Sequence, residues 1–205
     1  MGGIIFMEWK NMLDECCADE LEEMVIDNIR VGFLSNSEIL EECKEYIEEN
    51  YPDDCCKFNT DEFLKIIQLL RNKHQNTGDQ KNFLRLDSAF SNLRKQCIVA
   101  LHCAGFTQSD GFDDCNEIAS EKYKNGKRII GCCFYTMQDL AHILHEESTS
   151  LYFSFGNYFD QPSAEEVGQK IAEELGAVGF SVKWDQTANT KIAIEDFEWD
   201  KCYLG

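Results

Sequence analysis

Apolar residues recur every three or four positions through the first third of the chain, which is the spacing of an amphipathic helix. The segment "DELEEMVIDNIR" places its apolar side chains on one stripe and its acids opposite. "SNSEILEECKEYIEEN" begins with a capping box, Ser35 and Glu38, because each side chain can bind a free amide of the first turn. A third helix is predicted to begin at Thr60 or Asp61. The predicted stripes are Leu21, Met24, Val25 and Ile29, then Ile39, Leu40, Cys43, Tyr46 and Ile47, then Phe63, Leu64, Ile67 and Leu70.

A further helix is predicted in "NFLRLDSAFSNLRKQ". After it, the spacing of apolar residues is no longer that of a helix. Short β-branched or alternating runs predict strands, and "CIVALHC" also fits a continuation of the helix. "DQTANT" alone separates the last two strands, which predicts an antiparallel hairpin. The predicted strands are 97–103, 129–135, 150–156, 180–184 and 191–199, with helices at roughly 112–125, 136–147 and 163–177, the last opened by a capping box at Ser163 and Glu166 and closed by Gly176.

Helices followed by a sheet with intervening helices predict an α+β protein. We expect an N-terminal helical region over 1–78 and an α+β domain over 79–205, with a mixed, mainly antiparallel sheet packed with helices. "NKHQNTGDQ" marks the boundary. A chain of 205 residues with 43% hydrophobic side chains can bury a core without a metal or disulfide staple.

The formal net charge is −19, and it is unevenly distributed. Residues 1–58 carry 16 acids against 4 bases, residues 59–100 carry 4 against 7, and residues 101–205 carry 18 against 8. Such a field repels nucleic acids and anionic membranes, so we expect neither as a partner. It favours a basic protein as partner, although a solvated acidic surface is also a common feature of soluble proteins.

The cysteines indicate a reducing compartment. The chain has 11, an odd number, and six of them stand in adjacent pairs, unlike a secreted disulfide framework. We expect them to be reduced and mostly buried. The apolar run Ile4 to Met7 is too short for a signal peptide, and no segment approaches the length of a membrane span. These features predict a cytoplasmic protein.

The stretch "GFTQSDGFDD" (105–114) carries the densest polar chemistry. A calcium loop is excluded, because its first ligand position would be Phe106. Gly105 and Gly111 are expected to turn the chain, with Asp113 or Asp114 capping the next helix. No Cys-x-x-Cys spacing occurs, and His142 with His145 would need a further ligand, so we expect no metal or cofactor.

"FYTMQDL" (134–140) stands where a strand ends and a helix begins, a common place for a pocket. Thr136 and Asp139 form a capping box there. Tyr135 and Gln138 lack so simple a structural account. No catalytic residue is assigned, and Asp110 is the only plausible base. The candidate binding residues are Thr107, Gln108, Asp110, Asp113, Tyr135, Gln138, Asp139 and Trp184.

Several motifs in one order resemble an uncharacterised bacterial domain-of-unknown-function family: "FTQSDGFDD", "CFYTMQDL", "LYFSFG" and "VKWDQTANTKI". The similarity covers roughly residues 80–200, with a looser helical match before them. It implies a small cytosolic α+β protein with no assigned activity. Some members carry a Thr-Cys-Cys-x-x-Cys-Gly run where this chain has residues 107–111, which are oxygen-bearing or glycine. Thiol chemistry at that run does not transfer to this chain.

Two functions remain. The first is a non-enzymatic, acidic protein-interaction module, of which an immunity or inhibitor protein for a basic partner is one version. The second is a small-molecule-binding or hydrolytic domain with a pocket near Asp110, Tyr135 and Gln138. The acidic field and the absence of a nucleophile elbow or phosphate loop from the sequence favour the first.

Overall fold

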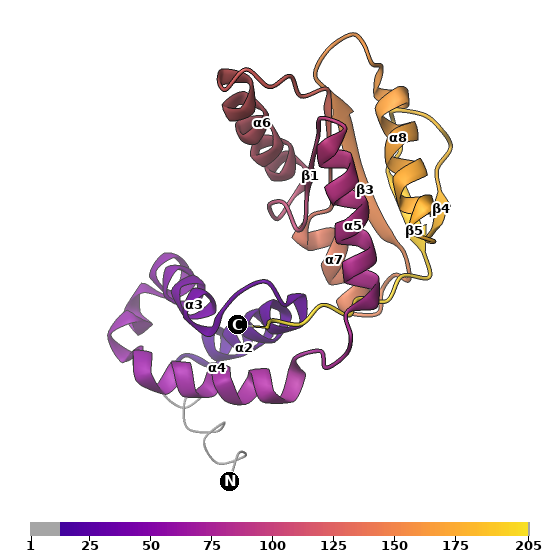
Figure 1. Cartoon of the computed structure of the whole chain (residues 1–205). Helices are drawn as coiled ribbons and strands as arrows, with labels where there is room; N and C mark the ends of the chain where they lie inside the picture. Colours follow the sequence, from indigo (N-terminus) through magenta and orange to yellow (C-terminus); the bar gives the residue numbers. More distant parts are fainter. Residues whose placement is uncertain (1–12, 205) are drawn as a thin grey trace. The chain divides into compact units, whose positions relative to one another are not determined.

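The computed structural model describes residues 13–204, and the predicted α+β class is confirmed (Figure 1). The chain forms two compact units, one from residues 13–80 with 200–204 and one from residues 81–199. We call them the helical unit and the sheet unit. The apolar run Ile4 to Met7, discussed above as too short for a signal peptide, lies outside the described residues.

The helical unit contains α2 (Glu15–Val31), α3 (Asn36–Asn50), the short 3-10 helix η1 (Pro52–Lys57) and α4 (Thr60–His74). The predicted capping box of Ser35 and Glu38 is confirmed. Asn59 caps α4 by accepting hydrogen bonds from two amides of its first turn. Gly32 ends α2 with a φ of 75°, a left-handed conformation that suits glycine.

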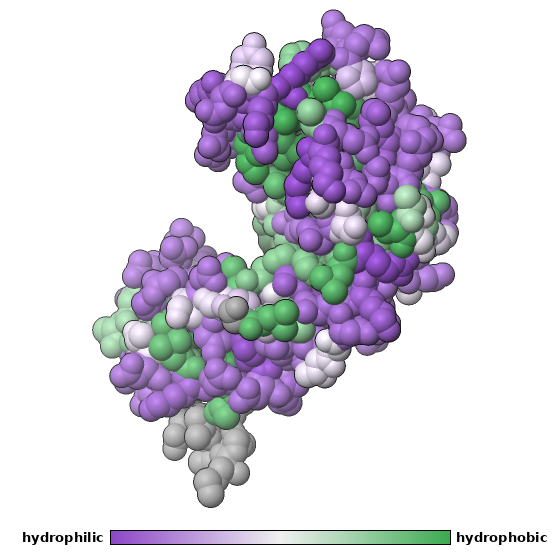
Figure 2. Space-filling view, viewed as in Figure 1, coloured by the Kyte–Doolittle hydropathy of each residue, from purple (hydrophilic) through white to green (hydrophobic). Residues whose placement is uncertain are grey.

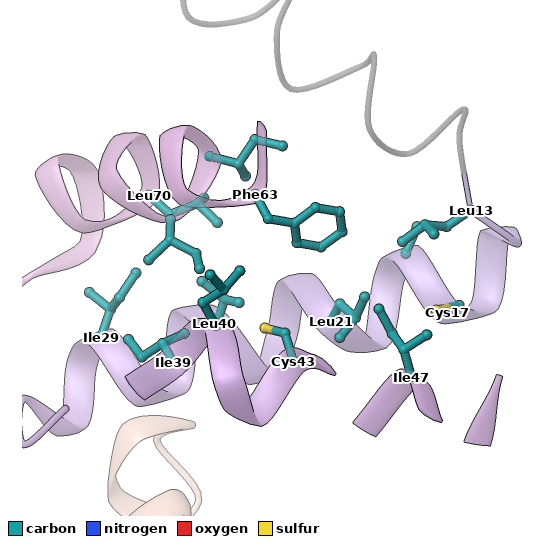
Figure 3. Close-up of a cluster of buried hydrophobic side chains, with 14 residues drawn as sticks. Leu13, Cys17, Leu21, Ile29, Ile39, Leu40, Cys43, Ile47, Phe63 and Leu70 are labelled. Atoms are coloured by element: carbon teal, nitrogen blue, oxygen red, sulfur yellow. The ribbon is translucent and has the colours of Figure 1, made fainter. Parts of the chain in front are cut away.

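The three long helices of this unit bury their predicted apolar stripes against one another (Figure 3). Leu21, Ile29, Ile39 and Cys43 are fully buried, and Leu70 nearly so. Met24, Tyr46 and Leu64, which share the predicted stripes, lie at the edge of the core and are only partly buried. Helical periodicity therefore located this core, although the predicted stripes omitted Cys17 and Ile66, which are buried in it too.

Residues 200–204 complete the helical unit. Asn76 Nδ2 donates to the carbonyl oxygens of Arg30 and Lys201, at 3.2 and 2.8 Å. The backbone amide of Cys202 donates to Gln80 Oε1 at 3.0 Å. These bonds attach the C-terminal segment to residues that lie more than a hundred positions earlier. The sequence pattern had placed the segment with the sheet.

The sheet unit alternates helices and strands. Its five strands lie in the order β1-β2-β3-β5-β4, with β1 and β2 parallel and the other neighbours antiparallel. The predicted hairpin of the last two strands is confirmed, and "CIVALHC" forms a strand. The elements are α5 (Lys81–Lys95), β1 (Ile98–Leu101), α6 (Gln108–Lys124), β2 (Gly131–Phe134), α7 (Met137–Leu144), β3 (Leu151–Asn157), α8 (Ala164–Ala177), β4 (Ser181–Lys183) and β5 (Ile192–Glu195).

Helices cover both faces of this sheet (Figure 1). Side chains alternate along β2: Cys132 and Phe134 pack with α6, whereas a Cβ on Gly131 would meet Val167 of α8. Helices α5 and α8 pack together on that second face. The mixed sheet is therefore buried on both sides at its parallel strands, which explains the continuous apolar run there.

Hydrophilic side chains cover most of the surface visible in Figure 2, within each unit. Interrupted apolar patches lie between them. None of the helices in residues 13–204 combines the length and the apolar character needed to cross a membrane.

Helix α6 runs so close to β2 that a Cβ on Gly111 would lie 2.2 Å from Phe134 Cε2. We expect Gly111→Ala to lower the free energy of unfolding by about 2 kcal/mol through overpacking. Gly176→Ala is the matched control, because no heavy atom would lie within 4 Å of its added Cβ. That control should raise stability by roughly 0.5 kcal/mol, since alanine favours a helix. Urea unfolding measures both, and equal stability of the two variants would contradict the packing described here.

Candidate functional site

The loop after β1 begins a helix earlier than the sequence suggested. Thr107 is the N-cap of α6, and Asp110 completes a capping box, with Asp110 Oδ2 accepting from Thr107 N at 2.8 Å. The expectation that Asp113 or Asp114 caps this helix is therefore wrong. The chain turns before Thr107, at Cys103 and Gly105, whose φ angles are 49° and 58°.

Gly111, which was predicted to turn the chain, and Asp113, which was predicted to cap the helix, both lie within α6 instead. Gly111 sits inside the helix, where its missing side chain admits Phe134. Asp113 is exposed on the same helix. The two glycines of "GFTQSDGFDD" thus have different roles. Gly105 adopts the left-handed conformation of a turn, and Gly111 allows the ring of Phe134 to approach the α6 backbone closely.

The loop after β2 likewise leads into a helix that begins with a capping box. The predicted capping box of Thr136 and Asp139 is confirmed, with Asp139 Oδ2 accepting from Thr136 N and Oγ1 at 3.1 and 2.9 Å. The second oxygen, Asp139 Oδ1, accepts from Lys191 Nζ at 2.8 Å. Both oxygens of this buried carboxylate are therefore engaged, and its role is structural.

Hydrogen bonds join the two loops. The amide of Ala104 donates to the Tyr135 carbonyl at 2.9 Å, and the amide of Met137 donates to the Gly105 carbonyl at 3.0 Å. Because β1 and β2 are parallel, both loops lie at their carboxyl ends and form one surface. We call it the loop surface. It brings together Thr107, Gln108, Asp110, Gln138 and Asp139 of the predicted residues, and Gln108, Asp110 and Gln138 are exposed on it beside Phe106.

Trp184 lies at the other end of the sheet. It follows β4, which is antiparallel to β5, while β5 runs in the direction of β1 and β2. Its ring packs against Phe155 and over Gly168, and its Nε1 donates to the Thr187 carbonyl at 3.0 Å. The structure does not bring Trp184 to the loop surface.

Tyr135 lies fully buried beneath the loops and takes part in a polar chain. Its hydroxyl is 3.1 Å from His102 Nδ1, and His102 Nε2 is 3.2 Å from Asp87 Oδ1. A carboxylate only accepts hydrogen bonds, so Nε2 carries the ring proton and Nδ1 accepts from the tyrosine hydroxyl. The ring of Phe90 stacks on His102 at 4.5 Å.

Sequence reasoning missed Asp87 and His102 as partners of Tyr135. Asp87 is 15 positions from His102, and Tyr135 is 33 positions from it. No local pattern links positions so far apart. The only available signal was a histidine within an apolar strand segment, since a buried ring nitrogen needs a partner.

The surroundings set the protonation of these groups. Burial, with smaller contributions from Cys103 and Asp87, raises the pKa of Tyr135 well above its ordinary value, so the hydroxyl stays protonated. The backbone and side chain of Thr107 hold the pKa of Asp110 below its usual range, which makes this carboxylate a weak base. The loop surface therefore exposes the amide side chains of Gln108 and Gln138 and the ring of Phe106 beside a carboxylate that is a poor base.

A second candidate surface lies on the helical unit. Glu20 of α2 accepts hydrogen bonds from the hydroxyls of Tyr46 and Tyr51 at 2.6 and 2.7 Å. These bonds lower the pKa of Glu20 and raise that of Tyr46 to about 12. The carboxylate is consequently held in place and charged. The neighbouring helix α3 carries exposed glutamates at 41, 45, 48 and 49, which with Glu20 we call the acidic face.

The fold thus defines an α+β protein with a helical unit and a five-stranded mixed sheet whose loops form a polar surface. A family model described as "Domain of unknown function (DUF6891)" matches residues 14–203. The chain belongs to this family. The match extends through the N-terminal helices, beyond the region that carried the sequence resemblance. Neither a curated protein nor a solved structure matches the chain significantly.

The buried hydroxyl of Tyr135 makes stability depend on alkaline pH. Its pKa is raised in the folded state, so its contribution is complete below the unfolded-state value near 10 and is lost as pH rises above it. Urea unfolding at pH 8 and pH 11 should therefore show wild type losing about 1.4 kcal/mol more than Tyr135→Phe.

Tyr123→Phe is the control for this measurement, because Tyr123 is 68% exposed. It should follow the wild-type pH dependence. At pH 8, Tyr135→Phe should also cost about 1–2 kcal/mol, because His102 Nδ1 loses its donor. Parallel pH curves for wild type and Tyr135→Phe would contradict the assignment of this buried, protonated hydroxyl.

Proposed function

We propose that this protein is a non-enzymatic interaction module that docks a basic protein through its acidic face. An immunity or inhibitor protein is one version of that function. The observation that supports the proposal is the placement of the α3 glutamates. They project from the side of the helix opposite its buried stripe, where their charge is available to a partner.

The acidic face combines free and fixed charges. Of its α3 members, Glu41 pairs with Lys44 at 2.7 Å on the surface, an interaction of little energetic weight. Glu20 is oriented by two tyrosine hydroxyls. A fixed carboxylate loses less side-chain entropy on docking than a free one. Clustered charge of one sign also raises the rate of encounter with a partner of opposite sign.

Glu42 has a different role from its neighbours on α3. Its carboxylate is half-buried and accepts from Asn28 Nδ2 at 2.7 Å. Burial raises its pKa above the ordinary value despite that hydrogen bond. Glu42 therefore belongs to the contact between α2 and α3, and a test of docking should leave it unchanged.

Binding is favoured over hydrolysis at the loop surface too, because the capping boxes engage Asp110 and Asp139. Small-molecule binding there is the second candidate function. It is favoured by the exposure of Phe106, at 60%, beside Gln108 and Gln138. Exposed aromatic rings next to hydrogen-bonding amides are typical of recognition surfaces. Phe106→Ser tests this surface separately from the acidic face.

The test replaces four glutamates of α3 together: Glu41→Gln, Glu45→Gln, Glu48→Gln and Glu49→Gln. A control variant removes four exposed acids of the sheet unit, Glu117→Gln, Glu121→Gln, Asp160→Asn and Glu173→Gln, for the same change in net charge. Both variants should keep the melting temperature of the wild type, because exposed carboxylates contribute little to stability. Immobilised wild type and control should retain the same basic protein from native cytosol, and the α3 variant should lose it.

The association rate with that basic protein then shows whether the acidic face attracts the partner or is only a solvated surface. At low salt the α3 variant should associate about tenfold more slowly than wild type, and its rate should depend less on salt. The control variant should differ little from wild type. Equal association rates for all three proteins would reject the acidic face as a docking surface. Loss of the partner only in Phe106→Ser would transfer the interaction to the loop surface.

A further inference from the structure

Arg71 is a buried cation near the end of α4, with 7% of its surface exposed. Its guanidinium donates to three oxygens. Nε donates to Asn36 Oδ1, Nη2 donates to the Leu34 carbonyl at 2.7 Å, and Nη1 reaches Gln75 Oε1 at 3.4 Å. The ring of Tyr203 lies 4.8 Å from its central carbon. All of these groups belong to the helical unit.

The partners found for Arg71 within residues 13–204 are uncharged. Burial lowers the pKa of the Arg71 guanidinium, and Tyr203 offsets this in part; no carboxylate of residues 13–204 contributes. The other buried charged side chains in the described part of the chain are paired: Asp54 with Lys57 and Asp139 with Lys191. Burying a charge without a counter-charge is costly. The chain contains 38 acidic residues, any of which is a possible counter-charge for an arginine. Retaining the positive charge at this position therefore suits a ligand of negative charge.

A chain of side-chain amides extends from the arginine. Because a guanidinium only donates, Asn36 must present its oxygen to Arg71 and its NH2 outward. Asn36 Nδ2 accordingly donates to Gln68 Oε1 at 2.8 Å, and Gln68 Nε2 donates to Asn72 Oδ1 at 3.0 Å. The direction of every bond follows from the first. The exposed NH2 of Asn72 ends the chain as a donor, polarised by the bonds behind it.

These groups line a pocket with a volume of about 550 Å³. Its walls come from the start of α3, the end of α4 and the C-terminal segment. An arginine has five N–H donors, and three of those of Arg71 are used as described, so two remain on Nη1 and Nη2. Pockets of this size hold small molecules. The lining residues are Asn36, Gln68, Arg71, Asn72, Gln75, Thr77, Tyr203 and Leu204.

We propose that this pocket binds a small molecule through an oxyanion, either a carboxylate or a phosphate, held by Arg71 and the terminal amide of Asn72. The ring of Tyr203 and the exposed side chain of Leu204 supply an apolar wall for the rest of the ligand. Guanidinium groups bind both kinds of oxyanion in bidentate geometry. The site is independent of the acidic face and uses none of its residues, so either can fail without the other.

The probes are sodium acetate and inorganic phosphate, added to the full ¹⁵N-labelled chain at constant ionic strength with sodium chloride as the reference salt. The readout is the Nε–Hε resonance of Arg71, assigned by its loss in Arg71→Lys. We expect one or both probes to shift this resonance saturably, with a Kd on the order of 1 mM. Saturation by acetate alone indicates a carboxylate ligand, and saturation by phosphate alone indicates a phosphorylated one.

Asn72→Asp places a negative charge at the pocket wall and leaves Arg71 in position. Because Asn72 is exposed, this variant should fold even if substitutions of Arg71 do not. It should raise the Kd of the responding probe at least about tenfold. Asn189→Asp, an exposed change in the sheet unit, adds the same charge and should leave the Kd unaltered. The proposal is overturned if neither probe shifts Arg71 up to about 50 mM, if chloride shifts it equally, or if Asn72→Asp binds as wild type does.

Discussion

Free amide groups at the first turn of each helix need acceptors, and this need shapes most of the polar chemistry in the chain. Helices α3, α6, α7 and α8 all begin with a reciprocal capping box, built from a serine or threonine and an acid three positions later. Two of these boxes lie in the loops that follow the parallel strands. The carboxylates that look most functional in the sequence, Asp110 and Asp139, are the ones that start α6 and α7. A group that must accept backbone hydrogen bonds to hold its helix in place is poorly suited to exchange protons with a substrate.

This constraint also explains how much of the fold the sequence predicts. Apolar periodicity and capping boxes are local signals, so the order and type of the predicted helices and strands and the caps at Ser35, Thr136 and Ser163 are confirmed, whereas the last strand ends at Glu195 and not at Trp199. The error at 105–114 was a choice between two local signals. Thr107 with Asp110 and the later Asp113 both resemble a helix start, and the helix begins at the earlier one, where both bonds of a capping box form. The end of α8 was predicted to within a residue, but the role of Gly176 was not: Gly176 lies inside the helix, and the left-handed glycine is Gly179.

Long-range polar contacts escaped prediction for a different reason. The Asp87–His102–Tyr135 chain and the Arg71 pocket are each assembled from segments far apart in the sequence. Tyr203 stands 132 positions after Arg71, and no periodicity connects them. In both cases the sequence did contain a weak signal, which was a polar residue within an apolar pattern. Such a residue indicates that a partner must exist and does not say where it lies.

Charge distribution connects the two proposals for this chain. A net charge of −19 would keep small anions away from most of the surface by repulsion. Arg71 belongs to the acidic helical unit, but it is the only charged side chain among the described residues that line its pocket. Its pocket wall is made of neutral amides and not of the carboxylates that are abundant elsewhere. The two proposals therefore place a basic macromolecule and a small oxyanion at separate sites of the same polypeptide. An acidic surround also favours anions that match the pocket closely, because only specific hydrogen bonds to Arg71 and its amide chain can offset the unfavourable field.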